Sequence, residues 1–184
     1  MSGSDMRYFP LPRRANLGAV LVLAGVCSAA AQGLPGGASS LNETHGDWTV
    51  ACTTLGGAVR CAVSQTQVNG ENRQRVLAAK LTATEGGKAA GGLLVLPFGL
   101  RLDSGVRLAI DEAAADETLR FSTCLPAGCL VPLSFDAAEL TALQSGKALS
   151  ITATANDGGQ ETAFSISLKG LSSALSRVNQ LNGI

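Results

Sequence analysis

Apolar residues at every second position, repeated in short segments, constrain the fold of this 184-residue chain more than any other feature. Trp48, Val50 and Cys52 alternate with polar or small residues, and Val106 and Leu108 show the same period. This alternation is typical of a β-strand that buries one face against a core and leaves the other in solvent. The chain is therefore predicted to consist mainly of half-buried strands.

Segments of this kind recur about every ten residues, with glycine-rich turns between them and few helical patterns. Such spacing predicts two antiparallel sheets packed face to face. The fold class is therefore all-β, a sandwich of about eight strands with one or two short helices. The run 93–96 is continuously apolar, which predicts a strand covered on both faces. The expected strands are 48–52, 59–63, 75–81, 93–96, 106–110, 119–121, 131–135, 149–153 and 164–168.

Two helices are expected in the C-terminal third of the chain. Asp136 is placed as an N-cap, and Glu139 three residues later as its capping-box partner. Gly146 is expected to end this helix in a left-handed conformation. From Leu171 onward the apolar residues follow helical spacing, which predicts a short terminal helix packed on the sheet. The acidic segment 112–117 is interpreted as a solvated loop.

Residues 1–31 are predicted to be a signal peptide outside the folded domain. Arg7, Arg13 and Arg14 precede an apolar run at 17–27, and small residues follow up to Ala31. This order is typical of secretory signal peptides, and cleavage is expected after Ala31. The run is also shorter than the roughly 20 apolar residues that a membrane-spanning helix needs.

Two alternatives for the N-terminal segment stay open. It could be retained as a membrane anchor, or Cys27 could carry a lipid, although the bulky Val26 before it fits a lipid-modifying peptidase site poorly. Residues 32–45 are rich in Gly, Ser and Ala and are expected to form a flexible lead-in. The β-sandwich domain is then 46–184, including the short C-terminal helix.

Four cysteines follow the predicted cleavage site: Cys52, Cys61, Cys124 and Cys129. An even number of cysteines beyond a signal peptide predicts two disulfides in an oxidising compartment. Three connectivities exist, and local pairing is favoured because each neighbouring pair flanks a turn. The rival hypotheses are a zinc site and a redox site, which need Cys-x2–4-Cys pairs or added histidines, or Cys-x-x-Cys at a helix start. Neither pattern is present.

Charge and motif content argue against several function classes. The chain has 14 basic and 14 acidic residues, so no net positive field would attract nucleic acid. His45 is the sole histidine, and no Gly-x-Ser-x-Gly motif accompanies it, so no catalytic site is predicted. Trp48 is interpreted as a core residue beside the first cysteine pair. No metal site and no cofactor site are predicted.

Five segments occur in an order that resembles a known family. They are 46–52 (Gly-Asp-Trp-Thr-Val-Ala-Cys), 61–65 (Cys-Ala-Val-Ser-Gln), 96–111 (beginning Leu-Pro-Phe-Gly, ending Gly-Val-Arg-Leu-Ala-Ile-Asp), 124–129 (Cys-Leu-Pro-Ala-Gly-Cys) and 167–171 (Ser-Leu-Lys-Gly-Leu). Their order resembles the invasion-associated locus B family of exported alphaproteobacterial proteins. The family often has Ala after the fourth cysteine and Phe after the late glycine, where this chain has Leu130 and Leu171.

The resemblance implies an immunoglobulin-like β-sandwich that is periplasmic, secreted or outer-membrane-associated. In some pathogenic members it also implies a link to entry into host cells, and it implies no enzymatic activity. The expected function is therefore non-catalytic binding of an envelope or host protein, with membrane contact only if the N-terminal segment is retained. The alternatives are a small-ligand-binding periplasmic protein and a membrane-anchored accessory subunit of a larger complex.

Pro97, Phe98 and Gly99 are the best candidates in the sequence for an exposed apolar contact with a partner. They interrupt an apolar strand pattern and combine a rigid residue, an aromatic ring and a flexible residue. Packing of Phe98 into the core is the simpler alternative, so both are kept as expectations.

Overall fold

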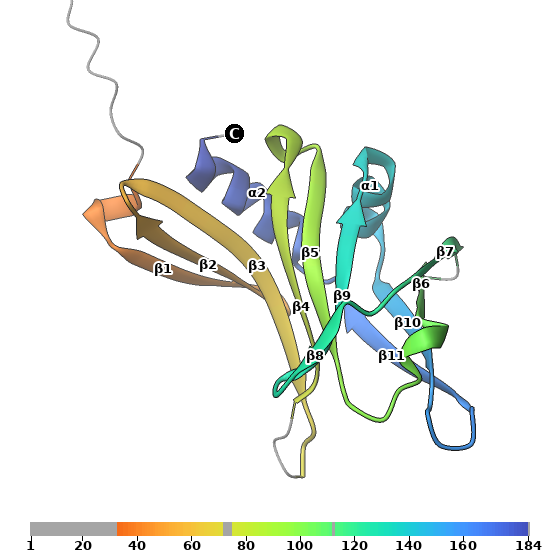
Figure 1. Cartoon of the computed structure of the whole chain (residues 1–184). Helices are drawn as coiled ribbons and strands as arrows, with labels where there is room; N and C mark the ends of the chain where they lie inside the picture. Colours follow the sequence, from red (N-terminus) through yellow and green to blue (C-terminus); the bar gives the residue numbers. More distant parts are fainter. Residues whose placement is uncertain (1–32, 72–74, 112, 184) are drawn as a thin grey trace, which may run out of the picture. The chain divides into compact units, whose positions relative to one another are not determined.

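The computed structural model describes residues 33–71, 75–111 and 113–183 (Figure 1). The predicted signal segment 1–31, with the lipidation alternative at Cys27, lies outside the described residues. Two antiparallel sheets form a sandwich with two short α-helices, so the predicted fold class is confirmed. None of the helices in the described ranges combines the length and the apolar character needed to span a membrane.

The larger sheet has seven strands in the order β1-β2-β3-β4-β5-β9-β8. Its strands are β1 (Ser40–His45), β2 (Trp48–Leu55), β3 (Ala58–Val68), β4 (Arg75–Thr84), β5 (Ala89–Leu96), β8 (Thr123–Leu125) and β9 (Gly128–Phe135). The first five are consecutive, so most of this sheet is a meander of hairpins. Immunoglobulin domains instead divide seven to nine strands between sheets joined by crossing connections. The strand order of this sandwich therefore differs from that of an immunoglobulin domain.

The smaller sheet has four strands in the order β11-β10-β6-β7. They are β6 (Val106–Ile110), β7 (Ala113–Leu119), β10 (Ala148–Thr154) and β11 (Glu161–Ser167). The helices are α1 (Ala137–Ser145) and α2 (Leu171–Asn182), and three short 3-10 turns are η1 (Pro35–Gly37), η2 (Glu85–Gly87) and η3 (Leu102–Ser104). The hairpin predicted around 156–159 is present as β10 and β11.

The core is built from the alternating residues that the sequence places on one face. Trp48, Val50 and Cys52 on β2 are at most 1% exposed, which confirms the predicted core position of Trp48. Val63 pairs with Leu81 on β4, and that row continues across the sheet. Burial of such rows is the main source of stability in a sandwich.

Close packing around residue 92 requires a glycine in this row. Gly92 pairs with Leu81 on one side and with Leu133 on the other. A Cβ at residue 92 would lie 2.6 Å from Cδ2 of Leu81, closer than real Cβ contacts come. Glycine therefore leaves the space that the side chain of Leu81 and the carbonyl oxygen of Lys80 occupy.

Helix α2 and the smaller sheet cover the inner face of the larger sheet. Helix α2 packs against β1, β2 and β3 and buries Leu171, Ala174, Leu175, Val178 and Leu181. These residues belong to one continuous apolar cluster with Ile151 and Ile166 of the smaller sheet. The predicted terminal helix, packed on the sheet, is confirmed.

Helix α1 begins as predicted and ends differently. Oδ1 of Asp136 accepts hydrogen bonds from the backbone N–H groups of Ala138 and Glu139, and Glu139 Oε2 accepts from the N–H of Asp136, which completes the capping box. The prediction of a left-handed Gly146 is wrong, because its φ of −74° is ordinary extended backbone. A Cβ there would lie 2.8 Å from Cγ2 of Ile110, so glycine serves close packing.

Two segments expected to be irregular are strands. Residues 40–45, the second half of the predicted lead-in 32–45, form β1 and pair with β2. Residues 113–119 form β7, where a solvated loop was expected at 112–117. Both lie at sheet edges, where polar and charged residues are common and the apolar alternation is weak. Backbone pairing with the neighbouring strand, rather than side-chain pattern, creates them.

Candidate functional site

The two disulfides link the cysteines that were predicted to pair locally. Cys52 and Cys61 face each other on β2 and β3, and both are buried. Cys124 and Cys129 join β8 to β9 across the turn at 126–127, with Cys129 buried and Cys124 exposed. The first bridge therefore belongs to the core, and the second fixes a hairpin at the edge of the larger sheet.

The candidate contact at Pro97, Phe98 and Gly99 lies directly after β5. Phe98 is 60% exposed, so packing of its ring into the core, the alternative interpretation, is wrong. Leu125, at the tip of the β8–β9 hairpin, is 49% exposed. A groove of about 410 Å³ beside them is lined by Arg75, Pro97, Phe98, Pro126, Ala127 and Gly128. Figure 1 places the segment after β5, the β8–β9 hairpin and the start of β4 at the same end of the sandwich. We call Phe98, Leu125 and the residues lining this groove the apolar end.

Backbone contacts on the C-terminal side hold Phe98 in its exposed position. The carbonyl oxygen of Gly99 accepts a hydrogen bond from the N–H of Asn156 (2.8 Å). Leu100 is buried and forms a β-bridge with Ala155. Because the residues after Phe98 are fixed to the β10–β11 connection, the exposed ring is presented by a structured segment.

A glycine lets the β8–β9 hairpin approach β5. Gly128 has φ +132°, and a Cβ there would lie 2.9 Å from Cγ1 of Val95. Its backbone is also in a region that L side chains rarely adopt. Gly128 thus brings Pro126 and Ala127 into the groove beside Phe98.

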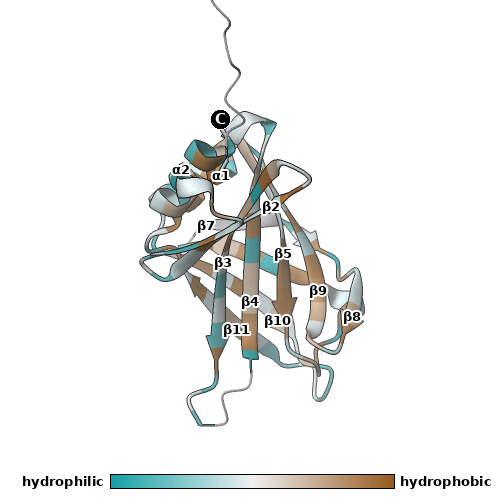
Figure 2. Cartoon of the chain, turned by 90° about the vertical axis from the view of Figure 1, so that its left-hand side faces the viewer, coloured by the Kyte–Doolittle hydropathy of each residue, from teal (hydrophilic) through white to brown (hydrophobic). Residues whose placement is uncertain are grey.

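Apolar residues continue from this end along the outer face of the larger sheet. Ala78 pairs with Val95, which in turn pairs with Leu130, and all three are half-buried. Figure 2 shows the same trend as brown colour along β5 and β9. The prediction that 93–96 would be covered on both faces is therefore wrong for the outer face. The apolar run that prompted it was nevertheless the signal in the sequence for this surface.

Leu125 and Leu130 are residues of this surface that the sequence analysis did not predict to be exposed. They lie on either side of the turn that the second disulfide closes, where an apolar residue is equally consistent with burial. Only the pairing of β9 with β5 and of β8 with β9 shows which face each residue occupies.

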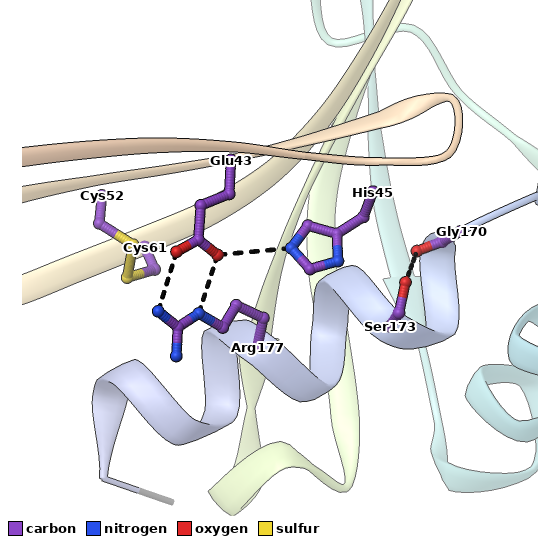
Figure 3. A network of polar contacts seen from close by, with 7 residues as sticks. All are labelled: Glu43, His45, Cys52, Cys61, Gly170, Ser173 and Arg177. Carbon is purple, nitrogen blue, oxygen red and sulfur yellow. Dashed lines mark hydrogen bonds and ion pairs between the residues drawn. A yellow bond between two sulfur atoms is a disulfide. The ribbon is translucent and has the colours of Figure 1, made fainter.

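A polar cluster, separate from the apolar end, joins β1 to α2 (Figure 3). Arg177 donates from Nε and Nη2 to the two carboxylate oxygens of Glu43, at 2.8 Å each. His45 Nε2 lies 3.4 Å from Glu43 Oε2. The hydrogen bonds from Arg177, with a smaller contribution from His45, lower the pKa of Glu43, and the same carboxylate raises the pKa of Arg177. The carboxylate is therefore ionised and fixed between the strand and the helix.

This cluster does not assemble the contacts of a serine hydrolase. Such an enzyme needs a serine hydroxyl hydrogen-bonded to a histidine. The hydroxyl of the neighbouring Ser173 instead donates to the carbonyl oxygen of Gly170 at 2.9 Å. Within the part of the chain that the structure covers, the His45 ring is bonded only to Glu43. The same described ranges hold no group of three His, Cys, Asp or Glu residues placed to bind a metal.

Comparison with known proteins identifies relatives of this chain. Residues 48–179 match the family described as "Invasion associated locus B (IalB) protein". An invasion protein B homolog of Brucella abortus (strain 2308) is 49% identical over 154 residues, which cover 84% of this chain and 88% of the relative. Invasion protein B of Bartonella bacilliformis is 35% identical over 150 residues, covering 80% of each chain.

A solved structure supports the same relationship. The crystal structure of invasion associated protein B from Bartonella henselae superposes with a TM-score of 0.73 at 34% sequence identity. The match covers 78% of this chain and 98% of that one. Sequence and fold agree over the β-sandwich, and the chain belongs to the invasion associated locus B (IalB) family.

Proposed function

We propose that this protein is exported and binds an envelope or host-cell protein through its apolar end, without catalysing a reaction. Membership of the IalB family supports a role at the cell envelope. The two disulfides fit an oxidising compartment, and the basic and apolar N-terminal segment fits export.

The exposure of Phe98 and Leu125 at the same end of the sandwich is the observation that carries this proposal. Large apolar side chains grouped on one surface are a feature of protein-binding sites, and aromatic anchors provide much of the binding energy there. The ring of Phe98 is held by a structured segment, so little conformational entropy would be lost on binding. Arg75 in the groove adds a cation, which fits a partner that presents an apolar side chain next to a carboxylate.

Site-specific photo-cross-linking in cells tests the proposed contact. A benzophenone amino acid replaces Phe98 in one variant and Lys88 in a control. Lys88 is exposed and precedes β5, whereas Phe98 follows it, so the two positions lie at opposite ends of the strand. We expect one discrete cross-linked species from residue 98 that the control does not form. Equal labelling from both positions, or none from residue 98, would contradict the proposal.

Three further measurements separate the parts of the proposal. Replacing Phe98 and Leu125 with serine should abolish the complex and change the free energy of unfolding by less than about 0.5 kcal/mol, because both side chains are exposed. Cross-linking in the presence and absence of host cells distinguishes an envelope partner from a host partner. Cell fractionation with intact-mass analysis should find a periplasmic or secreted chain that begins at Gln32 and contains two disulfides; a reduced cytoplasmic chain would contradict export.

A further inference from the structure

A second cavity, separate from the apolar end, lies between α1 and the β6–β7 hairpin. Its volume is about 500 Å³, within the range of pockets that bind small molecules. Leu108, Phe135 and Leu149 form a buried floor, and Ile110 and Leu119 are half-buried walls. The cavity therefore presents an apolar interior that is open to solvent on one side.

Carboxylates surround the opening of this cavity. Asp111, Glu117 and Glu139 are all exposed lining residues. Asp111 lies in the turn after β6, Glu117 on β7 and Glu139 on α1. The cation nearest to Asp111 is Lys147, which is exposed and follows α1. Among the described residues at this opening, three carboxylates outnumber one ammonium group. These charges would attract a cation and repel an anion.

Backbone hydrogen bonds fix one of these carboxylates in place. Asp111 Oδ1 accepts from the N–H groups of Lys147 at 2.9 Å and Ala148 at 3.0 Å. These bonds lower the pKa of Asp111, so its charge is present at neutral pH. Oδ2 is the carboxylate oxygen without a role in these bonds. Glu139 is likewise restrained, because Oε2 accepts from the N–H of Asp136.

We propose that this cavity binds a small cationic amphiphile, with the apolar part in the interior and a protonated amine at the carboxylates. The apolar floor excludes a fully polar ligand, and the charge at the opening selects a cation over a fatty acid of the same length. This would be a ligand-binding activity in addition to the partner binding proposed above, at a site built from different residues.

Titration of the full-length oxidised protein with decylamine, decanoate and decanol tests this proposal. The amine and the carboxylate are kept well below their micelle concentrations, and decanol below its solubility limit. Calorimetry gives the affinity, and backbone amide NMR shifts give the location. We expect saturable binding of decylamine, with shifts confined to α1, β6, β7 and the lining residues of β9 and β10. Binding should be about tenfold weaker for decanol and decanoate. Equal affinity for the amine and the carboxylate would overturn the ligand class. Shifts scattered over the surface, or no saturation, would overturn the site.

Matched variants separate the cavity from general effects of substitution. Ala142→Phe places a ring into the cavity and should weaken decylamine binding about tenfold or more. Gln144→Phe adds the same ring to an exposed position of α1 that does not line the cavity, and should leave affinity within about twofold. The double variant Glu117→Gln, Glu139→Gln keeps the capping box, because glutamine also serves at the position of Glu139. It should weaken decylamine binding about fivefold. If this pair leaves the affinity unchanged, the proposed charge recognition is wrong.

Discussion

At the scale of single residues, three side chains of the larger sheet donate hydrogen bonds to backbone carbonyl groups at the edge of the smaller sheet. Strand β11 lies at a sheet edge, so alternate carbonyl groups have no strand partner. Ser167 O accepts from Trp48 Nε1 and Gln65 Nε2, at 2.9 Å each, and Ser165 O accepts from Gln67 Nε2 at 2.6 Å. The edge is thus closed by side chains rather than by another strand.

Gln65 is the buried glutamine of this set, with 7% exposure, and its substitution tests the arrangement. Gln65→Leu removes two hydrogen bonds, the one that Nε2 donates to Ser167 O and the one that Oε1 accepts from Gln67 Nε2. It should lower the free energy of unfolding by about 1–2 kcal/mol. Gln65→Glu puts a buried carboxylate against a carbonyl oxygen and should cost about 2–3 kcal/mol at neutral pH. Urea unfolding followed by the fluorescence of Trp48, the single tryptophan, measures both.

Thr66→Val provides the control, since Thr66 is the exposed neighbour of Gln65 on the opposite face of β3. It should change the stability by less than about 0.5 kcal/mol. If the Gln65→Glu variant is no less stable than the Gln65→Leu variant, the hydrogen bond from Gln65 to β11 does not stabilise the contact between the sheets as described.

At the scale of elements, the two disulfide-linked hairpins differ in what surrounds them. In the chain-entropy account each bridge adds about 2–3 kcal/mol, because both close short loops. Removing the Cys52–Cys61 bridge by paired alanine substitution also leaves a gap in the core, whereas Cys124 is exposed. The first double variant should therefore lose more stability than the second, by about 1 kcal/mol or more.

Thermal and urea unfolding of both double variants measure this difference. The second variant has a separate expected effect, because it frees the hairpin that carries Leu125. It should reduce the photo-cross-link formed at residue 98 while keeping most of the stability. Equal stability losses from the two substitutions would show that burial of the first bridge contributes little.

Whether a helix or strand could be predicted from the sequence depended on how strongly its own side-chain pattern specifies it. The capping box of α1 and the alternation of β2 and β6 are local, so the sequence alone identifies them. Strands β1 and β7 have few large apolar residues and exist through pairing with a neighbour, which their own residues do not encode. Likewise, exposure of Phe98 depends on Gly99 and Leu100 being bound by a segment more than fifty residues away.

At the scale of the whole molecule, the Glu43–Arg177 pair connects the beginning of the sandwich to its last helix. It links β1, an edge strand, to α2 across 134 residues of sequence. Both side chains are partly exposed, at 28% and 29%, so the pair is partly shielded from solvent. The bidentate geometry fixes the position of the helix against the strand.

The pH dependence of stability tests this connection. The folded pKa of Glu43 is below its unfolded value, so the stabilisation is fully present above the unfolded pKa and is lost as the pH falls through the folded one. Arg177→Met should therefore lower the melting temperature between pH 5 and 8, and this difference should shrink below about pH 4. Lys80→Met, which removes an exposed cation on β4 outside the cluster, is the control. A difference that is independent of pH down to about pH 2 would show that the effect of Arg177 is packing alone.

The sequence by itself determined the strand-rich class, the main strands, both disulfide partners and the family, because these depend on local period, short loop closure and ordered motifs. The tertiary structure alone decided which apolar residues stay exposed, how the edge of β11 is closed and where the carboxylates meet α1. Each of these depends on contacts between residues far apart in the chain. The sequence shows whether a residue is apolar or charged, but only the packed structure determines which residues it contacts.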